Sequence, residues 1–150
     1  MTDSVNLALD KKNLDTILVL DFGSQYTQLI ARRVRELNVF SEILPWDISP
    51  ERIKALNPNG IILSGGPESV TALNTPRVPE IVFDLEVPIL GICYGMQTLA
   101  EQFGGQVTSS KAKEFGHAEI VIEETSVLFE GFSTGSSIDV WMSHGDHVST

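Results

Sequence analysis

Cysteine is nearly absent from this sequence, which has a single one, Cys93, among its 150 residues. One cysteine cannot form a disulfide within the chain, so a small secreted domain held together by disulfides is excluded. The first residues show no apolar segment of the kind that forms the centre of a signal peptide. We therefore expect the reducing cytoplasm as the compartment.

Basic residues and long apolar runs are also scarce. Ten Lys and Arg stand against twenty Asp and Glu, which gives a formal net charge of -10 at pH 7. With no dense basic cluster, binding to the phosphate backbone of a nucleic acid is not expected. No apolar stretch approaches the ~18 residues of a membrane-spanning helix, so we expect no membrane insertion.

The composition that remains is typical of a globular domain. Apolar residues make up 42% and charged residues 20% of the chain, and the length suits one domain with one core. Residues 1–15 are polar with scattered apolar side chains and predict a loose N-terminal extension. We expect residues 16–150 to form the domain.

Apolar runs alternate with helical patterns through the first two thirds of the chain. Strands are predicted at 17–21, 39–44, 60–64 and 87–92, each followed by a helical pattern, the last at 94–103. Ser24 and Ser49 are placed to cap two of these helices. The alternation indicates a doubly wound α/β fold, a mostly parallel sheet with helices on both faces.

The pattern changes after Gly105. Residues 118–123 alternate strictly between apolar and polar side chains, and 137–142 is another strand pattern. No long helix is predicted between them. These segments therefore predict a small antiparallel addition near the C-terminus.

Cys93 lies in the turn G-I-C-Y-G, residues 91–95, between a predicted strand and a predicted helix. Glycines at this spacing allow the sharp strand-to-helix turn that projects a nucleophile out of a sheet. The N-terminus of the following helix stabilises negative charge at such a position. Two further glycine turns, D-F-G-S at 21–24 and S-G-G-P at 64–67, end other strands, where ligands bind in this fold class. The N–H groups of Tyr94 and Gly66 are the predicted donors to an oxyanion.

A second interpretation of Cys93 stays open at this point. An isolated cysteine after an apolar run is also typical of a small buried core residue. A nucleophilic cysteine generally needs a base, normally histidine, and the candidates are His117, His144 and His147. His117 is most simply a surface residue, and loop histidines such as the other two are more often solvated than catalytic. The residues alone leave Cys93 without an assigned base.

Four motifs taken together are specific for one protein family. They are D-F-G-S-Q-Y-T-Q-L-I-A-R-R-V-R-E at 21–36, L-S-G-G-P-E-S-V at 63–70, G-I-C-Y-G-M-Q at 91–97 and W-M-S-H-G-D at 141–146. With them the chain closely resembles the glutamine amidotransferase domain of the GMP synthetase family, within the class I (triad) amidotransferases. The resemblance runs from about residue 16 to residue 150.

The resemblance implies a flavodoxin-like fold and a role for six residues. Cys93 is implied to attack the side-chain amide of glutamine, releasing ammonia and leaving a glutamyl thioester that water hydrolyses. The implied oxyanion donors are Gly66 and Tyr94, and the residues implied to hold the amino-acid end of glutamine are Gln97, Ser143 and His144.

The resemblance also implies partners outside this domain. Ammonia would pass to an ATP-pyrophosphatase synthetase domain, in the same chain or on a separate polypeptide, which uses ATP and magnesium to convert XMP to GMP. A homodimer would form through a C-terminal domain. The amidotransferase domain itself is implied to hold no cofactor and no metal.

One family feature is missing from the sequence. The catalytic His and Glu of the family lie in an H-P-E motif, and no H-P-E follows Cys93. We therefore expect a piece of a GMP synthetase, incomplete at its C-terminus and inactive or very weak alone. Two alternatives stay open: a non-catalytic module that binds glutamine or docks on a synthetase, and another cysteine hydrolase that uses His144 or His147.

Overall fold

The structure, a computed structural model, describes residues 15–149, with only the backbone described at 110–114. The predicted extension at 1–15 thus lies outside the described residues except for Asp15. The chain divides into two compact units, which are described separately below. The first contains the residues up to Thr108 and those from Val148 onward, and the second contains Ser109–His147.

The first unit is built on a parallel four-stranded sheet. Its strands are β1 (Thr16–Asp21), β2 (Phe40–Pro45), β3 (Gly60–Leu63) and β4 (Ile89–Gly91), in the spatial order β2-β1-β3-β4. The apolar runs form central strands because both faces of the sheet are covered, which leaves Leu18, Val19 and Leu20 fully buried. The predicted doubly wound α/β fold is confirmed.

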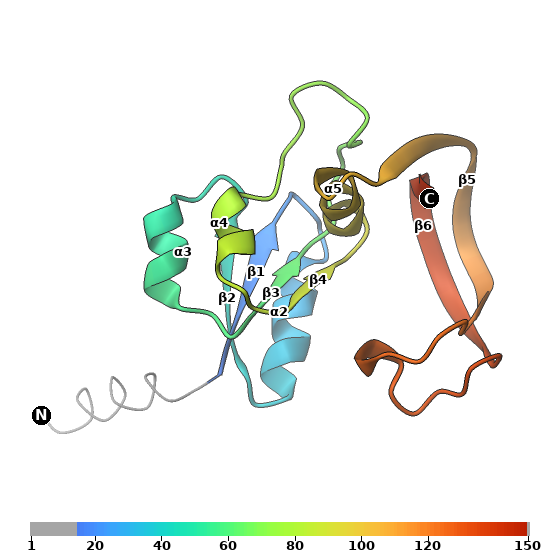
Figure 1. Cartoon of the computed structure of the whole chain (residues 1–150), viewed down its shortest axis with the longest axis horizontal. Coiled ribbons are helices and arrows are strands. Elements are labelled where there is room, and N and C mark those ends of the chain that lie inside the picture. Colours follow the sequence, from blue (N-terminus) through green and yellow to red (C-terminus); the bar gives the residue numbers. More distant parts are fainter. Residues whose placement is uncertain (1–14, 150) are drawn as a thin grey trace, which may run out of the picture. The chain divides into compact units, whose positions relative to one another are not determined.

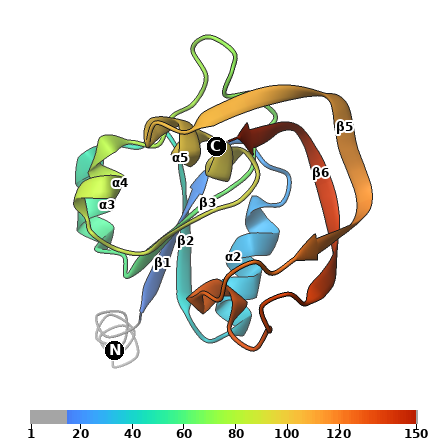
Figure 2. The same cartoon turned by 45° about the vertical axis from the view of Figure 1, so that its right-hand side comes forward.

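Among the described residues, four helices cover the sheet: α2 (Thr27–Glu36), α3 (Pro50–Leu56), α4 (Glu80–Asp84) and α5 (Tyr94–Gln102). Figures 1 and 2 both show α3 and α4 side by side, with α2 across the sheet from them. The main core cluster joins alternate residues of β1 and β3, including Leu18, Leu20 and Leu63, to side chains of α3, α4 and α5. Within the described residues, no helix is long and apolar enough to cross a membrane.

The two predicted serine caps have different outcomes. Ser49 is the N-cap of α3, where its side chain accepts a hydrogen bond from the N–H of Arg52 and Pro50 starts the helix. The cap predicted at Ser24 is wrong, because α2 begins at Thr27 with Tyr26 as its N-cap. Ser24 instead accepts the N–H of Tyr26 at 3.0 Å in the turn before the helix.

Replacing Ser49 by alanine should lower the free energy of unfolding by about 1 kcal/mol, because the N–H of Arg52 then loses its side-chain acceptor. Urea denaturation measures this loss. Ser126→Ala is the matched control, since Ser126 is also an N-cap serine but makes no side-chain cap bond. Equal losses in the two variants would contradict the assignment of the cap.

The second unit contains most of two long paired strands, β5 (Gln106–Val121) and β6 (Ser137–Ser149), and the short 3-10 helix η1 (Val127–Phe129). In Figure 2, β5 runs downward and β6 returns upward beside it, which confirms the predicted antiparallel addition. The predicted bounds of both strands are too short. Residues 106–117 are mostly polar or small and show no apolar alternation. They belong to β5 because they pair with β6.

Candidate functional site

Three glycine turns lie at one edge of the sheet in the first unit. Leu20 of β1 pairs with Leu63 of β3, and Leu63 pairs with Gly91 of β4, so the three strands end at the same level. The ladder continues one step further: Ser64 N–H donates to Leu20 O and Ile92 N–H donates to Leu63 O, each at 3.0 Å. The turns D-F-G-S, S-G-G-P and G-I-C-Y-G therefore start next to one another, as the sequence predicted.

Ser64 connects all three turns. It is fully buried, its Oγ accepts the N–H of Phe22 at 3.0 Å, and its carbonyl accepts the N–H of Gly95 at 3.0 Å. The same hydroxyl donates to the carbonyl of Gly65 at 2.9 Å. The sequence predicted Ser64 only as the end of a strand and the start of the S-G-G-P turn, and not as this connection. One feature of the sequence could have indicated this role. Ser64 is a polar residue at the end of the buried run G-I-I-L, and a buried hydroxyl group needs hydrogen-bond partners.

Cys93 is exposed and is the N-cap of α5, with φ 49° and ψ -115°. A positive φ is uncommon for a residue with a Cβ and marks a backbone held in place by its surroundings. The flanking glycines allow this turn. A Cβ on Gly95 would lie 2.4 Å from the carbonyl oxygen of Leu63, and one on Gly91 would lie 2.6 Å from Cα of Met96. Because the residue is exposed, the interpretation of Cys93 as a buried core residue is wrong. The sharp strand-to-helix turn has the backbone shape that a nucleophile elbow requires.

The two predicted oxyanion donors lie in the turns that meet at this edge. A Cβ on Gly65 would lie 3.4 Å from Cβ of Cys93, and one on Gly66 would lie 2.4 Å from the carbonyl oxygen of Phe22. The S-G-G-P turn thus packs directly beside the cysteine. Within residues 15–149, the N–H groups of Gly66 and Tyr94 have no hydrogen-bond acceptor.

The three residues implied to hold glutamine lie in different units. Gln97 is buried on α5, in the first unit, and its N–H donates to the carbonyl of Cys93 at 3.0 Å. Ser143 and His144 lie on β6, in the second unit. The first unit therefore brings together Cys93, Gly66, Tyr94 and Gln97.

The other candidate bases also lie in the second unit. On β5, His117 Nε2 is 2.9 Å from Asp139 Oδ1, and its side chain is 62% exposed, as predicted for a surface residue. His117 and Glu119 have H-x-E spacing, which was not among the predicted features, and alternation places both on one face of β5. His147 is exposed on β6. No group of three His, Cys, Asp or Glu suited to a metal occurs among the described residues.

Comparison with known families matches residues 18–150 to the model of the class I glutamine amidotransferases. Among similar curated proteins, the GMP synthase [glutamine-hydrolyzing] of Colwellia psychrerythraea is 60% identical over 139 residues, which is 89% of this chain. The protein of that name from Photorhabdus laumondii is 57% identical over 138 residues, 88% of this chain. The chain spans only 26% of the length of each relative.

Solved structures show the same fold. A putative GMP synthase subunit from Thermoplasma acidophilum superposes with a TM-score of 0.74 at 30% identity, covering 91% of this chain and 67% of that one. PurLQS from Thermotoga maritima superposes with a TM-score of 0.63 at 20% identity, covering 89% of this chain and 68% of that one, which supports the fold alone.

Proposed function

Because this chain belongs to the class I glutamine amidotransferase family, we propose that Cys93 hydrolyses glutamine by forming a covalent thioester. The thiolate attacks the carbonyl carbon of the side-chain amide, and the N–H groups of Gly66 and Tyr94 stabilise the resulting oxyanion. The C–N bond then breaks and the nitrogen leaves with a proton as ammonia. Water hydrolyses the glutamyl thioester to glutamate and restores the thiol.

The geometry of Cys93 is the observation that supports this proposal. An exposed cysteine at positive φ, between two glycines that admit no Cβ, presents its sulfur at the start of α5. Two unpaired backbone donors lie in the adjoining turns of the described chain. A core cysteine requires none of these features, whereas acyl transfer uses all of them.

The finer parts of the function rest on the family and on the named relatives. We propose that Gln97, Ser143 and His144 hold the amino-acid end of glutamine, and that residues 16–150 form the amidotransferase domain behind an extension at 1–15. Since the relatives are GMP synthases, we propose that the ammonia passes to a cytoplasmic ATP-pyrophosphatase synthetase domain or subunit, which uses ATP and magnesium to convert XMP to GMP. The family's base lies in an H-P-E motif, and no H-P-E follows Cys93. We therefore propose that repeated hydrolysis of glutamine needs further residues that supply a base.

Labelling with a glutamine-mimicking diazo-ketone tests this proposal. The thiolate of Cys93 should displace nitrogen from the reagent, and mass spectrometry should find the adduct on the peptide that contains Cys93. Excess glutamine should suppress the labelling, because it occupies the same pocket. The Cys93→Ala variant should remain unlabelled.

A shorter, asparagine-mimicking diazo-ketone is the matched reagent control. It carries the same reactive group on a side chain that is one methylene shorter. Weak labelling by this reagent would show that the pocket selects the length of the glutamine side chain. A folded sample that is not labelled, or whose labelling is insensitive to glutamine, would contradict the proposed function.

A further inference from the structure

Residues 65–79, here called the oxyanion loop because they include Gly66, contain no helix or strand. Segments of this length without regular structure are uncommon in compact domains and are often functional. The loop is nevertheless well packed, since Val70 and Val78 are almost completely buried. Its hydrogen bonds show what holds it.

At the start of α5, the side chain of Tyr94 holds the loop. Its hydroxyl group donates to the carbonyl of Pro76 at 2.5 Å, and only 2% of the residue is exposed. Its ring lies 5.5 Å from the ring of Phe22, which follows β1. The residue whose N–H is a proposed oxyanion donor therefore also binds the loop that carries the other donor.

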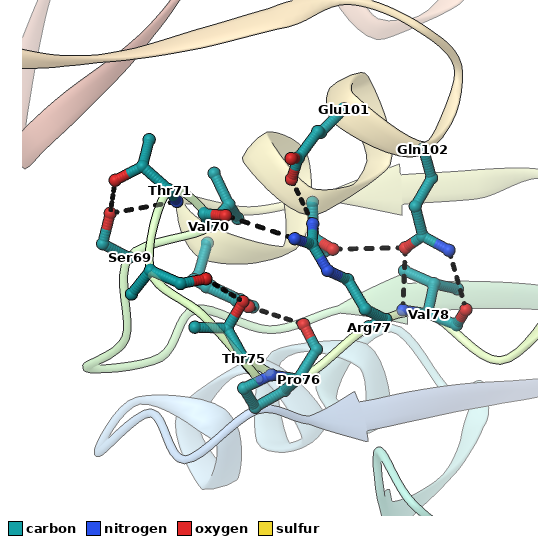
Figure 3. Close-up of polar contacts among 12 residues, drawn as sticks. Ser69, Val70, Thr71, Thr75, Pro76, Arg77, Val78, Glu101 and Gln102 are labelled. Carbon is teal, nitrogen blue, oxygen red and sulfur yellow. Dashed lines mark hydrogen bonds and ion pairs between the residues drawn. The ribbon is translucent and has the colours of Figure 1, made fainter.

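At the far end of α5, Glu101 and Gln102 bind the loop through its residues Arg77 and Val78 (Figure 3). The Arg77 guanidinium pairs with Glu101 and also donates to the carbonyl of Val70 at 3.2 Å, so it ties two parts of the loop to one helix. The Gln102 side chain accepts the N–H of Val78 at 2.9 Å and donates to its carbonyl at 3.0 Å. The loop is thus attached at both ends of the helix that begins after Cys93.

We propose that Arg77 and the hydroxyl group of Tyr94 are positioning residues that hold the oxyanion loop on α5, so that the N–H groups of Gly66 and Tyr94 converge on one oxygen. This inference rests on the proposed function. One donor lies on the loop and the other on the helix, so the contacts between loop and helix set their separation. Oxyanion donors act only over a narrow range of distance, and a displacement of about 1 Å can cost ~100-fold in rate.

A purely stabilising role for Arg77 is the weaker explanation. The side chains of Arg77 and Glu101 are 38% and 39% exposed, and ion pairs at such exposure contribute little to stability. The pair of Arg52 and Glu42, at 46% and 27%, is similar in exposure but joins α3 to β2. It provides a matched control that does not contact the oxyanion loop.

The test measures glutaminase kinetics and Cys93 alkylation in the chain assembled with its synthetase domain or subunit. Arg77→Met and Tyr94→Phe should each lower kcat for glutamine by about tenfold to 100-fold with KM nearly unchanged, because the lost interaction acts in the transition state. Arg77→Lys should also be impaired, since an ammonium group lacks the planar fork that serves Glu101 and Val70 together. Arg52→Met should keep the kcat of the parent protein. Alkylation of Cys93 by iodoacetamide, a displacement that needs no oxyanion hole, should proceed at the parent rate in every variant.

Three results would overturn the inference: parental kcat in both Arg77→Met and Tyr94→Phe, an equal fall in Arg52→Met, or alkylation that slows in step with kcat. Tyr94→Phe removes one oxygen and keeps the buried ring. Its kcat therefore still tests whether the contacts between loop and helix position the oxyanion donors if Arg77→Met does not fold. Failure of the proposed function gives a different result, because glutaminase activity would then persist in Cys93→Ala.

Discussion

Cys93→Ala is expected to lower glutamine hydrolysis by at least about 10⁴-fold, since removal of a nucleophile disables the whole catalytic unit. Amination by free ammonia should be retained in the same sample, because that reaction bypasses the thioester. The chain has no second cysteine to take over. Parallel assays with glutamine and with ammonium salt, in the chain assembled with the proposed synthetase domain or subunit, measure the two activities.

The comparison of the two nitrogen sources is the control for folding. A misfolded variant loses both activities, whereas loss of the nucleophile removes only the one that depends on glutamine. Cys93→Ser, which keeps the shape of the side chain with a weaker nucleophile, should show the same separation. Equal loss of both activities in all variants would count against a specific role for Cys93.

Gly95→Ala is expected to destabilise the first unit by about 3 kcal/mol, although alanine is the better helix former. The added Cβ would lie 2.4 Å from the carbonyl oxygen of Leu63 and 2.6 Å from its Cβ, where the end of β3 meets α5. Relief of this clash requires α5 to move away from the sheet, which displaces Cys93 and Tyr94. Urea denaturation should show the loss of stability, and labelling of Cys93 by the glutamine mimic should fall with it.

Gly104→Ala is the matched control for this prediction. Gly104 follows the same helix at φ 85°, and a Cβ there would contact nothing within 4 Å. Its replacement costs only the left-handed backbone conformation, about 1 kcal/mol, and should leave the labelling intact. If Gly95→Ala were as stable as Gly104→Ala, the close packing of α5 on β3 would be disproved.

The sheet was predictable because its signals are local. Buried runs such as I-L-V-L-D form central strands wherever helices cover both faces, and the turn after each run indicates which end carries the site. The start of β5 was not predictable in this way, because residues 106–117 lack apolar alternation and extend only through pairing with β6. The prediction of Ser24 as an N-cap was wrong for a different reason. Serine is a good capping residue, but the chain makes one more turn before α2 begins at Thr27.

The parts of the site that could be predicted from the sequence are the turns themselves, because glycines at fixed spacing mark them. Gly95 is required by the close approach of α5 to β3, and Gly91 by the close approach of α5 to β4, so their spacing around Cys93 indicated the sharp turn directly. The contacts of Ser64 and Arg77 were not predictable because their partners lie far along the chain, Phe22 and Glu101 respectively. No local pattern identifies a buried hydroxyl or a guanidinium that joins three segments.

The most direct test of the account is the mass of the Cys93 peptide during turnover. The chain, assembled with the proposed synthetase domain or subunit, would be mixed with isotopically labelled glutamine, quenched rapidly in acid and digested. Covalent catalysis by Cys93 predicts a glutamyl group on this residue that carries the label, is removed by hydroxylamine and is absent from Cys93→Ala. Ammonia release with no adduct on Cys93, or with the adduct on another residue, would contradict the central claim that this cysteine is the nucleophile.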